Sequence, residues 1–289
     1  MLSPTGLVLV RFAMSWGTKD SGTPADSATG VTAAGIVCNR RLFIILSPLA
    51  LSDVPTIRGV GLNYIKHSKT EINQPAANFR ELITAVQQAK RTPPTFPFMF
   101  FKPQTTILDH GDNMVIPKIA QDDQADYEGE LTIVIGKDAK DVSQENALDY
   151  VAVYTVGNDI SSRKLQRDPE HAGRIPQWGF SKGFDTYAPI GPCLLASSLV
   201  DDPKNLHLTT VVDGEVRQDE SVDDLLFECR YLISYLSQGT TLQKGSMIMT
   251  GTSGVGGDMK PPRWLQLGTQ MEVRISKIGT LRNGVVFAE

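Results

Sequence analysis

The stretch YEGELTIVIG, residues 127–136, alternates residue types in the way that predicts a β-strand. Successive side chains of a strand point to opposite faces, so Leu131, Ile133 and Ile135 share one face and are expected in the core. Glu128 and Glu130 project from the other face. The strand therefore combines an apolar side with a pair of like charges.

A second strand is predicted at residues 150–157, YVAVYTVG, and Asp159 follows it directly. If the two strands pair, the Asp159 carboxylate reaches the two glutamates. Like charges on one face repel when partly desolvated, and a bound cation relieves that repulsion. Three carboxylates favour Mg²⁺, Mn²⁺ or Ca²⁺ over zinc. The alternative is a solvated edge strand with alternating glutamates.

The residues after the second strand favour the metal site over the solvated edge. Polar side chains crowd at this strand end, a common location for functional sites: Asn158, Asp159, Ser161, Ser162, Arg163 and Gln166.

The remaining patterns indicate more strands than helices. Further strands are predicted at 42–51, 57–64, 247–250 and 271–275, and helices at 78–90, 143–149 and 221–239. Ser221 with Asp224 resembles a capping box, and Gly239 is a plausible helix stop. Strands do not alternate regularly with helices, which favours a β-rich α+β fold over a doubly wound sheet. Residues 1–55 are expected to form a small, divergent N-terminal region, with a loop over 15–35, before a main domain at 56–289.

Composition excludes several classes of protein. The chain has 289 residues and a net charge of −4, which argues against binding nucleic acid or an anionic membrane through bulk charge. No apolar run reaches the roughly 18 residues that a membrane span needs. The cysteines at 38, 193 and 229 are odd in number and far apart, which argues against disulfides and fits a reducing compartment. A cytoplasmic protein is expected, with a mitochondrial one as the alternative.

Four ordered segments resemble the fumarylacetoacetate hydrolase superfamily. They are GLNYIKH at 61–67, the run DYEGELTIVIGKDAKDVSQENALDYVAVYTVGNDISSRKLQ at 126–166, QWGFSKGFDTYAPIGPCL at 177–194 and MTGTSGVGG at 249–257. The resemblance spans roughly residues 57 to 285 and implies a mixed β-sandwich or roll with flanking helices, assembled as a homodimer.

The resemblance also implies roles for individual residues. Glu128, Glu130 and Asp159 match the positions that hold Mg²⁺ or Mn²⁺, with Ca²⁺ as another occupant. Lys182, four residues after Trp178, matches the pocket lysine, and Trp178 is expected either to wall the pocket or to pack in the core. The positions that match polar or substrate-contacting residues near the metal are Arg163, Gln166 and Thr252.

Substrates of the family are small β-keto or 1,3-dicarbonyl acids, whose two oxygens chelate the metal so that an enolate is stabilised. The leading expectation is hydrolysis of a C–C bond, as in acylpyruvates or fumarylacetoacetate. The alternatives are decarboxylation of oxaloacetate, keto–enol tautomerisation, and a catalytically silent relative that only binds metal or ligand.

His67 matches the family's lid histidine, the acid–base group over the metal. The family pattern is H-x-x-E, but here Thr70 occupies that position and the glutamate is Glu71. Residues i+3 and i+4 share a helix face, so Glu71 is expected to orient His67. This departure puts hydrolase-type water activation in doubt and favours the tautomerase or decarboxylase alternatives. Ser253 occupies the position at which the family motif TGTP usually has proline. His110 is expected in a loop.

Overall fold

The structure is a computed structural model that describes residues 8–9, 12–14, 30–32, 35–38, 41–45, 49–64, 94–253 and 262–289. Side chains are described only from residue 49 onward. The helix predicted at 78–90, His67 and Glu71 lie outside the described residues.

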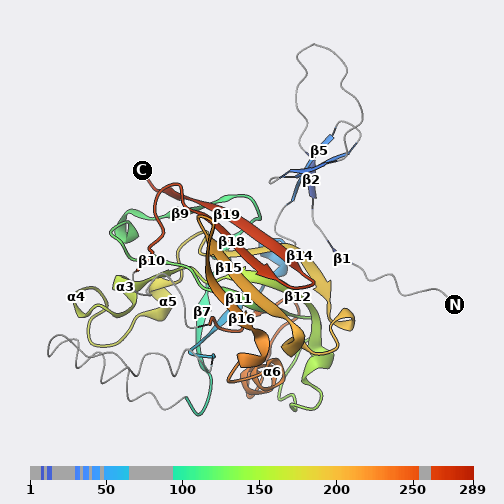
Figure 1. Cartoon of the computed structure of the whole chain (residues 1–289). Helices are drawn as coiled ribbons and strands as arrows, with labels where there is room; N and C mark the ends of the chain where they lie inside the picture. Colours follow the sequence, from blue (N-terminus) through green and yellow to red (C-terminus); the bar gives the residue numbers. More distant parts are fainter. Residues whose placement is uncertain are drawn as a thin grey trace.

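An eight-stranded sheet contains the two strands predicted at 127–136 and 150–157 (Figure 1). Its order is β1-β14-β12-β11-β17-β6-β7, with β8 paired to β14. The strands are β1 Val8–Leu9, β6 Ile57–Gly61, β7 Phe98–Lys102, β8 Ile107–Leu108, β11 Gly129–Ile135, β12 Val151–Asn158, β14 Ala188–Ala196 and β17 Met247–Met249.

A five-stranded sheet packs on β11, β12 and β14 of the first sheet. Its order is β16-β15-β18-β19-β9. Its strands are β9 Asn113–Ile116, β15 His207–Val212, β16 Glu215–Ser221, β18 Gln270–Ile275 and β19 Gly279–Phe287. Leu131 and Ile133 of β11 join Leu208 and Val273 of the facing sheet in one buried cluster. The expected mixed β-sandwich is confirmed, because two sheets share this core.

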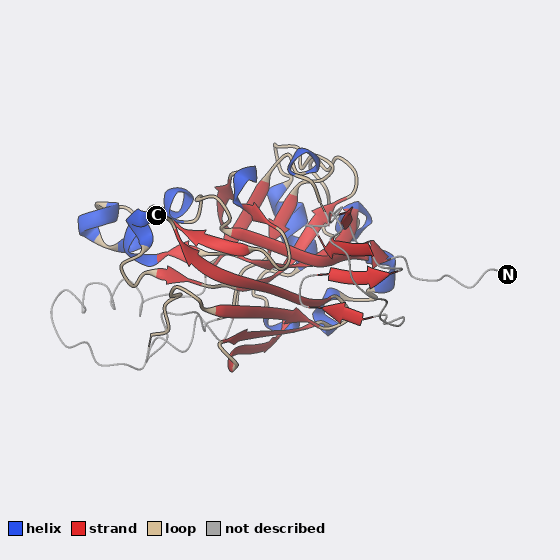
Figure 2. Ribbon diagram, turned by 90° about the horizontal axis from the view of Figure 1, so that it is seen from above, coloured by secondary structure: helices blue, strands red, loops and turns tan. Residues whose placement is uncertain are grey.

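The helices are short and lie around the strand layers (Figure 2). Among the described residues, the α-helices are α3 Arg163–Arg167, α4 Pro169–Ala172, α5 Trp178–Ser181 and α6 Cys229–Leu236. The 3₁₀-helices are η1 Leu51–Asp53, η3 Gln104–Thr106, η4 Lys118–Ala120, η5 Ala147–Tyr150, η6 Ser197–Leu199, η7 Pro203–Asn205 and η8 Val222–Asp224. Two small sheets complete the fold: β10 Ala125–Asp126 with β13 Ser161–Ser162, and β2 Phe12–Met14, β3 Gly30–Thr32, β4 Gly35–Cys38 and β5 Arg41–Ile45.

The prediction of one long helix at 221–239 is wrong. Ser221 caps only the single 3₁₀ turn η8, and α6 begins at Cys229. The segment between them is a bridge followed by a bend, and Asn63 binds it: the Asn63 side chain accepts from Phe227 N–H at 2.7 Å and donates to Phe227 O at 3.1 Å. Gly239 has φ +67°, the left-handed conformation expected of a helix stop.

Other predicted elements differ from the structure in their bounds or in their type. The helix expected at 143–149 is the 3₁₀ turn η5, which begins at Ala147. The strand at 57–64 ends at Gly61, and Tyr64 makes only an isolated bridge to Leu225. The strand expected at 42–51 is β5, which ends at Ile45, and β3 lies inside the expected loop at 15–35.

The N-terminal strand β1 pairs with β14 of the main sheet. The domain boundary at residue 55 stays a prediction. The homodimer is likewise still a prediction. Within the described residues, no helix is long and apolar enough to cross a membrane. Cys193 and Cys229 are buried free thiols.

At Gly129, the first residue of β11, the facing sheet comes close to the β11 backbone. A Cβ atom there would lie 2.3 Å from Thr210 Oγ1, 2.9 Å from Val273 Cγ1 and 3.0 Å from Gln218 Oε1. Glycine therefore stands between Glu128 and Glu130 because the facing sheet leaves no room for a side chain.

We expect Gly129→Ala to destabilise the fold by about 1–3 kcal/mol, the usual cost of overpacking a core. The measurement is the free energy of unfolding in urea. Gly179→Ala is the matched control, because nothing lies within 4 Å of a Cβ at Gly179. Equal stability of the two variants would contradict the close approach at Gly129.

Candidate metal centre and substrate pocket

Glu128, Glu130 and Asp159 form one buried cluster. Each offers a carboxylate oxygen, and these three oxygens lie within 4.8 Å of one another. Antiparallel pairing of β11 and β12 sets Gly129 opposite Asn158, and Asp159 N–H donates to Glu128 O at 2.8 Å. The strand pairing predicted from the sequence therefore brings the three carboxylates together.

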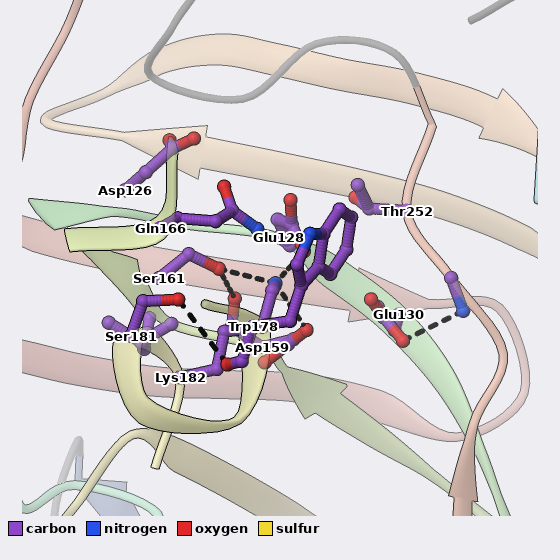
Figure 3. A network of polar contacts seen from close by, with 12 residues as sticks. Asp126, Glu128, Glu130, Asp159, Ser161, Gln166, Trp178, Ser181, Lys182 and Thr252 are labelled. Atoms are coloured by element: carbon purple, nitrogen blue, oxygen red, sulfur yellow. Dashed lines mark hydrogen bonds and ion pairs between the residues drawn. The ribbon is translucent and has the colours of Figure 1, made fainter. Parts of the chain in front are cut away.

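Two fully buried lysines contact the cluster from different elements. Lys182, directly after α5, lies 2.7 Å from Glu128 Oε2 and 2.7 Å from Asp159 Oδ2, and donates to Ser161 Oγ at 2.5 Å (Figure 3). Lys102, the last residue of β7, lies 2.5 Å from Asp159 Oδ1. Both oxygens of Asp159 are thus held by ammonium groups.

Arg163 holds the other side of Glu128. Its guanidinium contacts Glu128 Oε1, lies 2.6 Å from Asp126 Oδ2 and donates to Gln166 Oε1 at 3.0 Å. The Gln166 amide is directed toward Glu128 (Figure 3). Its Nε2 is buried and has no hydrogen-bond partner among the described residues. Gln166 therefore offers a free donor inside the site.

The surroundings separate the two glutamates electrostatically. Burial alone would raise the pKa of Glu128, but Arg163 and Lys182 hold it well below its usual range. Burial raises the pKa of Glu130, and the charges of Asp159 and Glu128 raise it further. Glu130 receives one hydrogen bond, from Gly251 N–H at 2.8 Å, and no described Lys or Arg pairs with it. Repulsion from the other two carboxylates therefore acts on Glu130 without an ion pair from a described lysine or arginine to offset it.

A divalent cation fits this donor set. The three converging groups are hard carboxylate oxygens, the ligands preferred by Mg²⁺, Mn²⁺ and Ca²⁺. A cation would relieve the repulsion that raises the pKa of Glu130. Glu128, Glu130 and Asp159 would hold the ion, beside Lys182, which contacts Glu128 and Asp159, and Lys102, which contacts Asp159.

Aromatic rings wall the site beside Lys182. Its Nζ lies 5.0 Å from the Phe100 ring centre and 5.4 Å from that of Trp178. Phe98 meets Trp178 edge to face at 4.7 Å. A Cβ at Gly61 would lie 2.7 Å from the Trp178 ring, so this glycine lets the indole lie against β6. Trp178 is only partly buried, and of the two expectations for it the pocket wall fits better than the core.

Thr252 lies in the turn that follows β17. Its hydroxyl donates to Gly129 O at 3.0 Å and accepts from Gln218 Nε2 at 2.6 Å. The preceding Gly251, with φ +97°, provides the N–H bound to Glu130. Thr252 therefore sits next to the metal ligands, and its substrate contact stays a prediction. His110 lies in a turn, as expected, where its Nδ1 accepts from Arg282 N–H at 3.1 Å.

Three polar residues of the site had no role in the sequence prediction: Lys102, Asp126 and Gln218. Lys102 ends the apolar run FMFFK, and a lone charge that closes such a strand was the available signal. Asp126 lies two residues before Glu128, but its pairing with Arg163 depends on how α3 packs. For Gln218, one polar residue among several on an edge strand, we find no local signal.

A family model described as "Fumarylacetoacetate (FAA) hydrolase C-terminal" matches residues 56–286. The chain belongs to the fumarylacetoacetate hydrolase family. The match includes the acidic cluster, Lys182 and the turn at Thr252.

Named relatives in the family differ in reaction. Oxaloacetate tautomerase YisK of Bacillus subtilis is 42% identical over 66% of this chain, and the match spans 62% of that relative's length. Caffeoylpyruvate hydrolase of Neonothopanus nambi is 39% identical over 83% of this chain and 71% of its own. The solved structure of fumarylacetoacetate hydrolase from Exiguobacterium antarcticum superposes with a TM-score of 0.68 and 32% identity, covering 86% and 81% of the two chains.

We expect Glu130→Gln to weaken Mn²⁺ binding by more than about 100-fold, since even loss of an outer partner costs up to that much. The metal-free variant should be at least as stable as the unsubstituted protein, because the uncompensated charge is gone. Mn²⁺ at about 100 times its Kd should stabilise only the unsubstituted protein, by about 2.7 kcal/mol.

Titration calorimetry and thermal unfolding with and without Mn²⁺ measure both effects. Glu145→Gln, which changes an exposed carboxylate, is the control and should bind as the unsubstituted protein does. Unchanged Mn²⁺ affinity in Glu130→Gln would rule out Glu130 as a ligand.

Proposed function

We propose that this protein is a Mg²⁺- or Mn²⁺-dependent enzyme that hydrolyses a C–C bond in a small β-keto or 1,3-dicarbonyl acid of the acylpyruvate or fumarylacetoacetate type. The observation that carries this proposal is the acidic cluster with Lys182 bound to two of its members, Glu128 and Asp159. A divalent ion held there would act as a Lewis acid on two substrate oxygens and favour the enolate form.

The protein's own groups bind and orient such a substrate. Lys182 has three hydrogens on a fully buried ammonium and supplies a positive charge next to a developing oxyanion. The free Nε2 of Gln166 suits a carboxylate or carbonyl oxygen, since burying that donor without a partner is costly. The rings of Phe100 and Trp178 lie beside the Lys182 ammonium and would shield it from water when substrate is bound.

Proton transfer is assigned to His67, with Glu71 as its orienting partner. Hydrolysis requires a base that takes a proton from water and an acid that protonates the released carbon. His67 follows Tyr64 by three positions in the sequence. Arg163, engaged with Asp126 and Glu128, is proposed to hold the pocket floor and Gln166 in place.

Keto–enol tautomerisation of oxaloacetate is the second candidate. Two observations favour it: the 42% identity to a relative named oxaloacetate tautomerase, and the shifted glutamate at 71. Tautomerisation moves one proton between carbon and oxygen and consumes no water, so a single acid–base group suffices. A lid histidine with an irregular partner is adequate for that reaction.

Incubation with acetylpyruvate and with oxaloacetate, each with Mg²⁺ and followed by NMR, separates the reactions. Hydrolysis converts acetylpyruvate and water to acetate and pyruvate, whereas tautomerisation only accelerates keto–enol exchange of oxaloacetate. Decarboxylation would yield pyruvate and CO₂ from oxaloacetate. We expect acetylpyruvate cleavage that a chelator abolishes and that His67→Ala removes. A protein that turns over neither acid would be a silent binding relative.

Lys182→Met should lower kcat by about 10²–10³-fold, the usual effect of losing one oxyanion-stabilising group. Mn²⁺ binding should persist, because the three carboxylates remain. Lys140→Met, an exposed position, is the control. Steady-state kinetics measure the effect, and an unchanged kcat in Lys182→Met would show that Lys182 has no part in the reaction.

A further inference from the structure

Gln218 reaches into the candidate site from the facing sheet. It lies on β16, the edge strand of the five-stranded sheet, while the metal ligands belong to the eight-stranded sheet. Its side chain is buried, with the residue 1% exposed. A primary amide buried between two sheets must satisfy its donors and its acceptor within the protein.

The Gln218 amide does so entirely with groups of the site. Its Oε1 accepts from Gly129 N–H at 3.0 Å. Its Nε2 donates to Thr252 Oγ1 at 2.6 Å, to Ser253 O at 3.2 Å and to Ser253 Oγ at 3.2 Å. The amide orientation is fixed by these partners, because a backbone N–H only donates and a backbone carbonyl only accepts.

These contacts close a ring around Gly129. Thr252 Oγ1 donates to Gly129 O, Gly129 N–H donates to Gln218, and Gln218 donates to Thr252 Oγ1. The last residue pair of β11 and β17 is Thr132 with Met249. Thr250 N–H still donates to Leu131 O at 3.0 Å, and beyond it the Thr252 side chain makes the link to β11. The two peptide groups of Gly129 join Glu128 and Glu130, so the ring holds the backbone between two metal ligands.

The Ser253 hydroxyl adds a contact to the Gln218 amide. Where the family usually has proline, Ser253 supplies a hydroxyl to the Gln218 amide. A proline has no such acceptor and fixes its own φ angle. In this chain the Thr252–Ser253 turn is held by three hydrogen bonds from the Gln218 amide and has no proline ring to restrict φ at position 253.

We propose that Gln218 is a positioning residue that holds the Thr252–Ser253 turn in register with the Glu128–Glu130 segment, and thereby sets the affinity for substrate. The inference rests on the proposed function for its kinetic part only. Three of the four hydrogen bonds of Gln218 go to the turn, so its loss should act mainly on the substrate-binding turn.

The test uses Gln218→Glu, which keeps the shape but places an acceptor against the Ser253 carbonyl. We expect KM for acetylpyruvate to rise about tenfold, the factor that corresponds to one lost buried hydrogen bond, while kcat changes less than about threefold. Amide hydrogen exchange over residues 127–131 should be about tenfold faster.

The double variant with Thr252→Val separates positioning from general stability. If Gln218 acts through Thr252, adding Gln218→Glu to Thr252→Val should change KM by less than about twofold. Gln243→Glu, an exposed glutamine changed in the same way, is the matched control and should leave KM and exchange unaltered.

KM effects that multiply in the double variant, or a lower Tm with unchanged KM and unchanged exchange at 127–131, would overturn the proposal. If the unsubstituted protein turns over none of the acids, the proposed function fails. The exchange measurement alone then decides whether Gln218 holds the Gly129 segment.

Discussion

Mutual repulsion among Glu128, Glu130 and Asp159 is the constraint around which the rest of the site is arranged. Their oxygens converge within 4.8 Å in a buried position, where like charges repel far more strongly than in water. Lys102, Lys182 and Arg163 oppose it by ion pairs to Asp159 and Glu128.

The balance of charge explains why the site suits an acid substrate. Asp126 adds a fourth carboxylate, so four carboxylates face three cations when all are ionised. These seven side chains then have a net charge of −1, and a bound divalent ion would change the net charge of the site to +1. That surplus would attract an anionic substrate to a buried site, where each charge acts more strongly than at the surface.

The backbone holds this cluster through two kinds of contact. Pairing of β11 with β12 sets Asp159 beside Glu128. The close approach of the second sheet at Gly129 fixes the backbone between the glutamates. The sandwich core and the acidic cluster therefore share one strand, with Leu131 and Ile133 on the core side and Glu130 on the site side.

The sequence patterns predicted those features of the site that depend on residues close together in the chain. The two-residue period of β11 gave the common side of Glu128 and Glu130, and the strand end gave Asp159. Gln218 could not be found in this way, because the approach of β16 to Gly129 brings it in. The lone charge of Lys102 at the end of FMFFK marked the residue but not its partner, which depends on the pairing of β7 with β6. The helix predicted at 221–239 failed for the same reason: Asn63, 164 residues before Phe227, binds the segment that interrupts it.

The metal site is the central claim, and anomalous diffraction from Mn²⁺-soaked crystals tests it most directly. The account predicts a single strong peak within about 2.0–2.3 Å of oxygens from Glu128, Glu130 and Asp159, with Lys102 and Lys182 still in contact with Asp159. Absence of a peak there, with the three carboxylates neutralised by lysine and arginine alone, would contradict it.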